Sequence, residues 1–171
     1  NPMKPEKVRL VFDCAAQFKR TSLNDVLLPG PDLTTPLVNV LMRFRTKKVG
    51  ISGDIQDMYH RVFVREEDRS FQRFLWRDQK SRELIDFEMC VMTFGATCSP
   101  SLAQHVKNQN ALRFERDCPE AVDAIIYEHY VDDWLGGGAT EEEVIQLAKD
   151  VVRIQGEAGF TMHKFQSNST A

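Results

Sequence analysis

The sequence lacks the features of membrane-spanning, secreted and zinc-binding proteins. No apolar run approaches the ~20 residues that a membrane-spanning helix needs. No signal peptide is recognisable, and because residue 1 is Asn rather than Met, we expect the chain to be part of a longer, intracellular protein. The four cysteines form no CxxC pair and have no histidine at zinc-ligand spacing, so reduced thiols are expected. Internal repeats, low-complexity tracts and obvious linkers are also missing.

What the sequence does contain is typical of a globular domain with an uneven charge distribution. Of its 171 residues, 42% are hydrophobic and 27% charged. Residues 1–82 hold 16 Lys and Arg against 10 Asp and Glu (+6), and residues 83–171 hold 6 against 15 (−9), which sum to −3. A basic half favours a polyanionic partner and an acidic half favours bound cations, although a solvated surface of mixed charge is the plainer explanation.

Hydrophobic periodicity predicts an α+β fold. Strands are expected over residues 7–13, 49–55, 71–77, 83–92 and 160–165, with the third and fourth forming a hairpin. Helices are expected over residues 36–45, 99–116 and 140–158, and a loop over residues 23–36. We predict that Ser99 caps the second helix and that Thr140 and Glu143 form a capping box on the third. The order of elements predicts an antiparallel sheet with helices packed on one face.

The stretch "YEHYVDDWLGGG" at 127–138 places two carboxylates side by side. A strand from Tyr127 is expected to turn back through Trp134, which leaves Asp132 and Asp133 at a hairpin tip. Adjacent carboxylates repel, and a divalent cation with oxygen ligands would relieve the repulsion. Asp54 lies on a strand face with small neighbours, so the three carboxylates can converge on a two-metal site. A solvated turn is the alternative explanation.

Five motifs in sequential order carry a resemblance to a known family. They are "RLVFDCAAQFKRTSLNDVLLPGPDL" (Arg9–Leu33), "GDIQDMYHRV" (Gly53–Val62), "FGATCSPSLAQ" (Phe94–Gln104), "YVDD" and "AGFTMHKFQSN" (Ala158–Asn168). Together they resemble the reverse transcriptase of BEL/Pao-type long-terminal-repeat retrotransposons. The resemblance implies a right-hand polymerase, with fingers over about 1–48 and 61–92 and palm over about 49–60 and 93–171. It also implies that the thumb and ribonuclease H regions are absent from these residues, so that template-primer is held weakly.

The resemblance assigns roles to individual residues. Asp54, Asp132 and Asp133 are the expected catalytic ligands of two Mg²⁺ ions, with Mn²⁺ as an alternative, and Lys164 is the expected general acid toward pyrophosphate. The implied nucleotide-binding residues are Arg9, Ile55, Tyr59, Phe94 and Gly95. The implied template- and primer-binding residues are Ser99, Pro100 and Tyr130. Asp57 is expected to accept backbone hydrogen bonds rather than to bind metal. Phe94 departs from many retroviral polymerases, which have glutamine there.

The implied partners are an RNA template, a DNA primer or product, and deoxynucleoside triphosphates. Protease, ribonuclease H and integrase domains of a polyprotein are further expected partners, and no membrane is involved. The implied location is the cytoplasm, with virus-like particles and the nucleus left open. The basic residues around the first catalytic motif are candidates for phosphate contacts (Arg43, Arg45, Lys47, Lys48, Arg61, Arg65, Arg69, Arg73 and Arg77). Some of these arginines are expected to pair with Glu66, Glu67 and Asp68 instead.

Two other classes of protein compete with the polymerase. A domesticated, non-catalytic module that binds RNA or protein would share the fold, but the intact triad argues against it. A nucleotide cyclase also uses carboxylates and two metals on a palm, but lacks the segment Arg9–Leu33.

Overall fold

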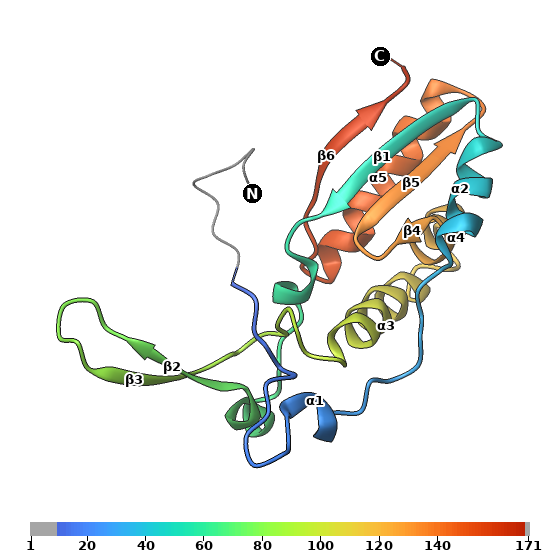
Figure 1. The fold of residues 1–171 in the computed structure, drawn as a ribbon. Helices are drawn as coiled ribbons and strands as arrows, with labels where there is room; N and C mark the ends of the chain where they lie inside the picture. The colour runs from blue at the N-terminus through green and yellow to red at the C-terminus, as the bar shows by residue number, and fades with distance from the viewer. Residues whose placement is uncertain (1–9, 170–171) are drawn as a thin grey trace.

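Four antiparallel strands form the central sheet of the structure, a computed structural model that describes residues 10–169 (Figure 1). Their order is β4 (His129–Tyr130), β5 (Asp133–Gly138), β1 (Val49–Ile55) and β6 (Met162–Ser167). The expected mixed α+β architecture with an antiparallel sheet is therefore confirmed. The prediction of a strand that begins at Tyr127 is wrong. Tyr127 is the last residue of a helix that was not predicted, α4 (Pro119–Tyr127).

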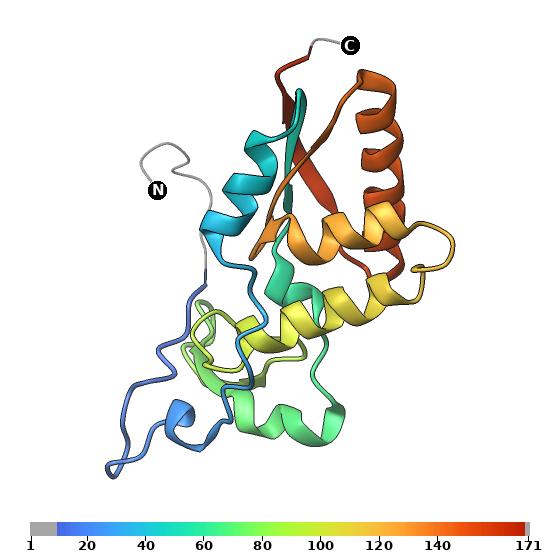
Figure 2. The same cartoon turned by 90° about the vertical axis from the view of Figure 1, so that its right-hand side faces the viewer.

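One face of the sheet is covered by α5 (Glu141–Glu157), which packs with α4 and α3 (Ser99–Leu112) as a helical layer (Figures 1 and 2). The predicted capping box is confirmed, because Thr140 Oγ1 accepts from Glu143 N–H and Glu143 Oε2 accepts from Thr140 N–H, both at 3.3 Å. The predicted Ser99 cap is wrong. Ser99 is the first helical residue of α3, and its hydroxyl donates to the Thr93 carbonyl at 2.7 Å.

A further helix, α2 (Leu37–Arg45), lies on the opposite face of the sheet (Figure 2). The ring of Phe44 covers Gly50 of β1, where a Cβ atom would lie 2.9 Å from the ring. Helices therefore cover both faces, and the prediction of helices on one face only is wrong. The small residues at alternate positions of β1 admit a helix here as well as a ligand, which the sequence pattern alone could not distinguish.

The hydrophobic core lies between the sheet and the layer of α3, α4 and α5. Ile55 of β1, Trp134 of β5 and Ile154 of α5 are fully buried in it. The Trp134 ring folds back over Gly136, where a Cβ atom would lie 2.4 Å from the ring, so glycine is required at position 136. A buried tryptophan removes ~200 Å² from water, which stabilises the fold by about 5 kcal/mol before entropy is subtracted. The strands that carry the candidate carboxylates are thus held by a packed core.

A two-stranded hairpin extends away from this body as an arm (Figure 1). It consists of β2 (Arg73–Arg77) and β3 (Leu84–Glu88), which confirms the predicted hairpin. Two 3₁₀ helices lie between β1 and this arm. They are η1 (Met58–Arg61) and η2 (Glu66–Gln72). No side chain of β2 or β3 is fully buried.

The N-terminal segment departs from the predicted pattern. Leu10–Asp13 is not a strand, although Phe12 N–H donates to the Phe94 carbonyl at 3.0 Å. The rest of that predicted strand, residues 7–9, lies outside the described residues. A short helix, α1 (Leu23–Val26), opens the predicted loop with a capping box between Ser22 and Asp25. Within residues 10–169, no helix has the length and apolar character to cross a membrane.

Candidate active site

The sheet brings the carboxylates of two distant motifs together. β1 and β5 are antiparallel neighbours, and their register sets Asp54 directly opposite Asp133. Opposite residues of an antiparallel pair have Cβ atoms about 5 Å apart. Asp132 follows from the turn before β5, and its carbonyl accepts from Ile55 N–H at 2.8 Å. Three carboxylates separated by up to 79 positions in sequence therefore converge at one end of β1.

The turn that carries Asp132 has a strained backbone and is supported by a hydrogen bond from α3. Val131 has a φ of 57°, in the left-handed region that a β-branched residue rarely occupies. Such a conformation costs about 1–3 kcal/mol and persists only where its surroundings impose it. Here the buried side chain of Gln104, on α3, donates from Nε2 to the Val131 carbonyl at 3.0 Å. Gln104 is thus a positioning residue for Asp132.

Negative charge is concentrated at the tip of this turn. Burial raises the pKa of Asp132, and the neighbouring charges of Asp133 and Asp54 raise it further, against an opposing effect of its own backbone N–H and of Lys164. A carboxyl group whose ionised form is destabilised in this way gains most from a cation placed beside it. The electrostatics of the turn therefore favour binding of a positive ligand.

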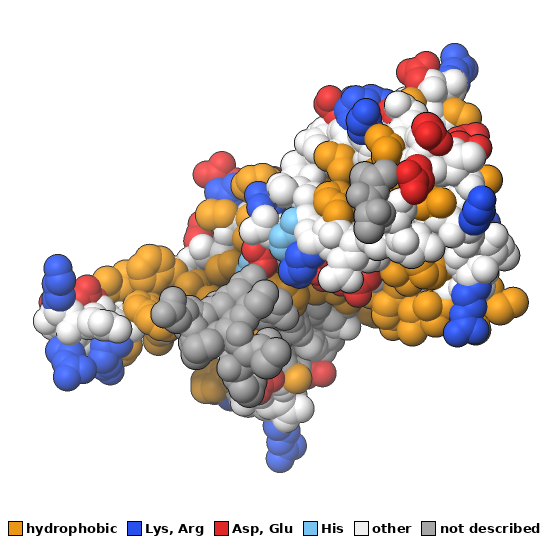
Figure 3. Space-filling view, turned by 90° about the horizontal axis from the view of Figure 1, so that it is seen from above, with side chains coloured by type: hydrophobic (Ala, Val, Ile, Leu, Met, Phe, Trp, Pro, Cys, Tyr) orange, Lys and Arg blue, Asp and Glu red, His pale blue; other side chains and the backbone are white. Residues whose placement is uncertain are grey.

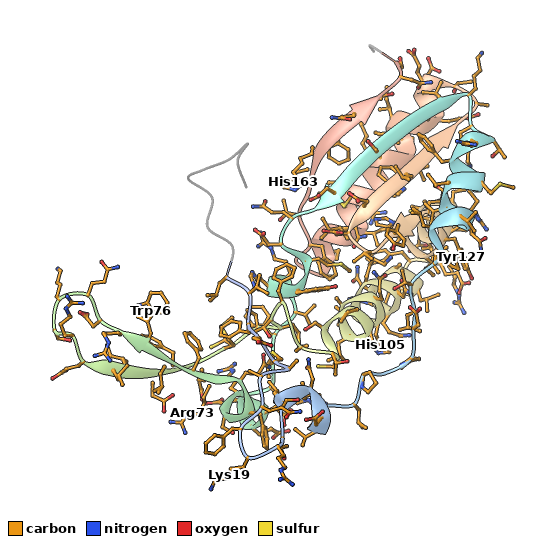
Figure 4. The ribbon with its side chains drawn as sticks, in the orientation of Figure 1. Lys19, Arg73, Trp76, His105, Tyr127 and His163 are labelled. Atoms are coloured by element: carbon orange, nitrogen blue, oxygen red, sulfur yellow. The ribbon has the colours of Figure 1, made fainter. Side chains whose placement is uncertain are left out.

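Asp54 already has two basic partners. Its Oδ1 contacts His163 Nε2 at 2.5 Å, and its Oδ2 accepts from Lys164 Nζ at 2.8 Å. Partial burial alone would raise the pKa of Asp54, but the hydrogen bonds and charges of Lys164 and His163 lower it below its usual value. His163 projects from β6 toward the end of β1 that carries Asp54 (Figure 4).

A cavity of about 210 Å³ opens beside the three-carboxylate cluster. Its lining residues are Asp54, Ile55, Asp57, Met58, Tyr59, Phe94, Val131, Asp132, His163 and Lys164. The rings of Tyr59 and Phe94 pack against each other with centroids 4.9 Å apart. Burial, with a smaller effect of Asp132, raises the pKa of the Tyr59 hydroxyl, which keeps this wall uncharged. The cavity thus has an acidic and basic rim and an aromatic wall.

A second hollow, of about 340 Å³, lies on the α2 side of the same strands. Tyr130, Asp133 and Asp54 line it together with Leu37 of α2. The two hollows share Asp54 and Lys164, so the carboxylates stand between two separate spaces.

Several predicted site residues lie away from both hollows. Gly95 has a φ of 114°, and a Cβ atom there would lie 1.9 Å from the Phe12 carbonyl oxygen, so its glycine admits the N-terminal segment. Ser99 is buried against Thr93, and Pro100 is exposed at the start of α3. Arg9 lies outside the described residues.

Within residues 10–169, the backbone carbonyl of Asp57 accepts from His60 N–H at 2.9 Å, but no backbone hydrogen bond to its carboxylate is seen. Asp57 has a left-handed backbone (φ 50°) and precedes η1, but its side chain makes no capping hydrogen bond. Its carboxylate lines the cavity with Asp54 and Asp132.

One of the basic residues predicted to pair with an acidic neighbour does so. Arg65 forms an ion pair with Glu67 at 3.6 Å.

The site has the chemistry for divalent cations but not a preformed cage. Asp54, Asp132 and Asp133 offer the oxygen ligands that Mg²⁺ prefers, and burial, with the charges of Asp133 and Asp54, raises the pKa of Asp132. Within residues 10–169, no group of three or more His, Cys, Asp or Glu side chains is arranged to hold a metal ion. The carboxylates therefore fit a metal, provided that the contacts of Asp54 rearrange.

Two residues at the site were missed in the sequence. His163 precedes Lys164, but on a regular strand neighbours point to opposite faces, so no periodicity argument places both on Asp54. Gln104 lies within the "FGATCSPSLAQ" motif, yet its hydrogen bond to Val131 depends on how α3 packs against the turn between β4 and β5.

The comparison with known families agrees with this geometry. No curated protein matches the chain. The family model described as reverse transcriptase (RNA-dependent DNA polymerase) matches residues 5–167, which is nearly the whole sequence. That span includes all three carboxylates, all the residues that line the 210 Å³ cavity, and β6. The chain therefore belongs to the reverse transcriptase (RNA-dependent DNA polymerase) family.

Proposed function

We propose that this protein is an RNA-directed DNA polymerase that adds deoxynucleotides to the 3′-hydroxyl of a primer on an RNA or DNA template. One observation carries the proposal. The register of β1 and β5 sets Asp54 opposite Asp133, and the strained turn places Asp132 beside them at the rim of a cavity. Family membership supports the same activity.

Asp54, Asp132 and Asp133 would hold two Mg²⁺ ions, or Mn²⁺ as an alternative. When bound, such ions lower the pKa of the primer hydroxyl and neutralise charge on the triphosphate and the leaving pyrophosphate. The chain contributes the orientation of the ligands. Asp54 and Asp133 are fixed by paired strands, and Asp132 by the turn that Gln104 supports.

The cavity would receive the incoming nucleotide. Tyr59 would lie against its sugar, backed by the ring of Phe94, and Ile55 would contribute its backbone. Lys164, whose side chain is 56% exposed, can swing from Asp54 to the departing pyrophosphate and donate a proton there. Arg9 and Gly95 remain candidates for the triphosphate side.

The template and primer would approach past Tyr130 and the start of α3, where Ser99 and Pro100 were predicted to contribute. Residues 49–60 and 93–171 would form the palm, and the hairpin arm part of the fingers. Residues 1–48 would also belong mainly to the fingers, with α2 contacting β5 at the border with the palm. The motifs favour a BEL/Pao-type retrotransposon polyprotein with protease, ribonuclease H and integrase domains as neighbours.

A non-catalytic nucleic-acid-binding module is the second candidate, favoured by one observation. Both oxygens of Asp54 are engaged by His163 and Lys164, as they could remain in a protein that no longer binds metal. The two candidates differ in whether a primer is extended.

Primer extension on an RNA template separates them. A labelled DNA primer annealed to RNA is incubated with the protein, deoxynucleotides and Mg²⁺, at protein concentrations above those that saturate duplex binding. We expect extension that stops with a chelator and returns with added Mg²⁺. Saturated binding of the duplex without any extension would instead identify a binding module.

A further inference from the structure

The strand β6 contains an irregularity beside the candidate active site. Ser52 pairs with Gln166, but Asp54, two residues further along β1, pairs with His163, three residues back along β6. One extra residue is therefore inserted in β6, which is the definition of a β-bulge. Within the bulge, Lys164 has a φ of 55°, in the left-handed region that a lysine rarely adopts and that glycine adopts freely.

The bulge changes where two consecutive side chains point. On a regular strand His163 and Lys164 would lie on opposite faces of the sheet. Here His163 Nε2 lies 2.5 Å from one oxygen of Asp54, and Lys164 Nζ lies 2.8 Å from the other. The Asp54 side chain is only 22% exposed, so these contacts are its main polar environment. Bulges near active sites commonly serve to redirect a side chain, and this one redirects two toward one carboxylate.

These contacts occupy the oxygens through which Asp54 would bind a metal ion. An ionised, partly buried carboxylate without a partner is costly, and the other two carboxylates of the site are close by. A pair of basic side chains removes that cost while no cation is bound. The same contacts must be given up, at least in part, when a cation takes the oxygens.

We propose that His163 and Lys164 form a placeholder pair, which satisfies Asp54 in the metal-free protein and competes with the metal ion for it. The proposal rests on the proposed function, since it takes Asp54 as a metal ligand. The placeholder pair makes metal binding weaker than it would be with the three carboxylates alone. It also couples metal binding to the release of Lys164, the residue proposed to act on pyrophosphate, so that the lysine becomes free when the site is loaded.

Direct binding of Mn²⁺ tests the competition without any catalytic step. The electron paramagnetic resonance signal of free Mn²⁺ is followed while the ion is titrated into the whole chain. His163→Leu removes the N–H donor, and Lys164→Gly removes the ammonium while accepting the left-handed backbone without strain. Each variant should lower the Kd for Mn²⁺ about tenfold, which corresponds to the loss of one competing hydrogen bond to a charged group.

Two controls separate displacement from general charge effects. Lys149→Ala removes a positive charge from the exposed face of α5, away from Asp54, and should leave the Kd unchanged. His163→Gln retains a donor that can reach Asp54 and should stay close to the wild type. Thermal melting of every variant verifies that the fold is kept.

The outcomes also separate this proposal from the proposed function. If Mn²⁺ binds, is lost in Asp132→Asn, but is no tighter in His163→Leu and Lys164→Gly, the placeholder pair is overturned and the metal site stands. Weaker binding in those two variants would make His163 and Lys164 supports of the metal site, which also overturns the competition. If neither the wild type nor the variants bind Mn²⁺, the metal assignment falls and takes the placeholder pair with it.

Discussion

The sheet and the hairpin arm are built from strands of similar sequence character, yet only the sheet has a core behind it. Trp134 of β5 is completely buried, whereas Trp76 of β2 is 52% exposed and stands out from the arm (Figure 4). Hydrophobic side chains run along the arm, with Lys and Arg at its tip (Figure 3). The difference arises because α5 packs behind the sheet, while within residues 10–169 the strands β2 and β3 contact chiefly each other and the short 3₁₀ helix η2. Strand character and burial are thus separate properties.

The comparison explains where the candidate site lies. A carboxylate cluster needs strands that are fixed to within a fraction of an ångström, and a packed core provides this. An isolated two-stranded hairpin is marginally stable in water. The arm is held mainly by local contacts, such as the pair of Arg73 and Asp86 and the stacked rings of Phe74 and Phe87, 5.8 Å apart. The edge-to-face pair of Phe12 and Phe74 joins the arm to the N-terminal segment.

The two tryptophans test the contrast most severely. Trp134→Ala should lower the free energy of unfolding by about 3–5 kcal/mol, because it empties the core between the sheet and α5. Trp76→Ala should change it by only about 0.5 kcal/mol, since the ring is exposed. Urea unfolding followed by circular dichroism measures both. Equal losses would show that the arm is packed as tightly as the sheet.

The next effect concerns the aromatic wall of the cavity. Tyr59→Val should admit ribonucleotides and lower the preference for deoxynucleotides by about 10²-fold, or about 2.7 kcal/mol, because the clash with the 2′-hydroxyl is removed. Single-nucleotide insertion kinetics with matched deoxy- and ribonucleotides measure the ratio. Phe87→Val in the arm is the matched control and should leave it unchanged. An active Tyr59→Val enzyme with wild-type selectivity would exclude this ring as the gate.

A smaller effect is expected from the buried lysine of α3. Burial lowers the pKa of Lys107 to about 7, because the side chain is almost completely removed from water. Because the unfolded pKa is about 10.4, the unfolded chain binds more protons between pH ~7 and ~10. Stability therefore rises with pH over this range and is lost as pH falls through about 7.

Lys107→Met should therefore raise the free energy of unfolding at pH 6 by about 1–3 kcal/mol and flatten its pH dependence. Lys80→Met, in the turn of the arm, should do neither. Urea unfolding at pH 6, 7.5 and 9 tests this. A less stable Lys107→Met protein at all three values would mean that the ammonium group contributes favourable contacts.

The smallest effect concerns salt dependence of nucleic-acid binding. Arg43 pairs with Asp123 at 2.8 Å and Lys47 with Glu128 at 3.5 Å. Arg45 and Lys48 are exposed and have no ion pair within residues 10–169. Replacing Arg45 and Lys48 with Gln should reduce the slope of log K against log salt by about 1–2, since each phosphate contact contributes ~0.7–0.9.

The matched change of Arg43 and Lys47 to Gln should alter the slope less, because these residues already neutralise carboxylates. Fluorescence anisotropy with a labelled RNA–DNA hybrid over a KCl series measures both slopes. The reverse order of effects would assign the phosphate contacts to the paired residues.

Much of the fold could be predicted from local patterns. The alternation in Val49–Ile55, the hairpin around the turn at 78–81 and the Thr140–Glu143 capping box are signals within a few residues, and the structure confirms each of them. The helix Pro119–Tyr127 was not predicted. Two signals in the sequence favour it, Pro119 in its first turn and the helical spacing of Val122 and Ile125, which are buried.

The site was harder to predict because its geometry depends on long-range pairing. That Asp54 faces Asp133 is a matter of register between strands about 80 residues apart. The contact of His163 with Asp54 depends on a bulge, which breaks the two-residue period on which sequence arguments rely. The burial of Ser99 against Thr93 likewise follows from how the segment before α3 folds, not from the Ser-Pro pair itself.

The central claim is that the sheet assembles a metal-dependent polymerase site, and one pair of substitutions tests it most directly. Asp132→Asn changes a carboxylate at the turn before β5, and Asp86→Asn changes an exposed one in the arm. Rates of primer extension on an RNA template are measured for both, with folding checked by thermal melting. The account predicts a loss of about 10³-fold or more for Asp132→Asn, because several kcal/mol of transition-state stabilisation disappear, and a near wild-type rate for Asp86→Asn. A well-folded Asp132→Asn protein that extends primers at the wild-type rate would contradict it.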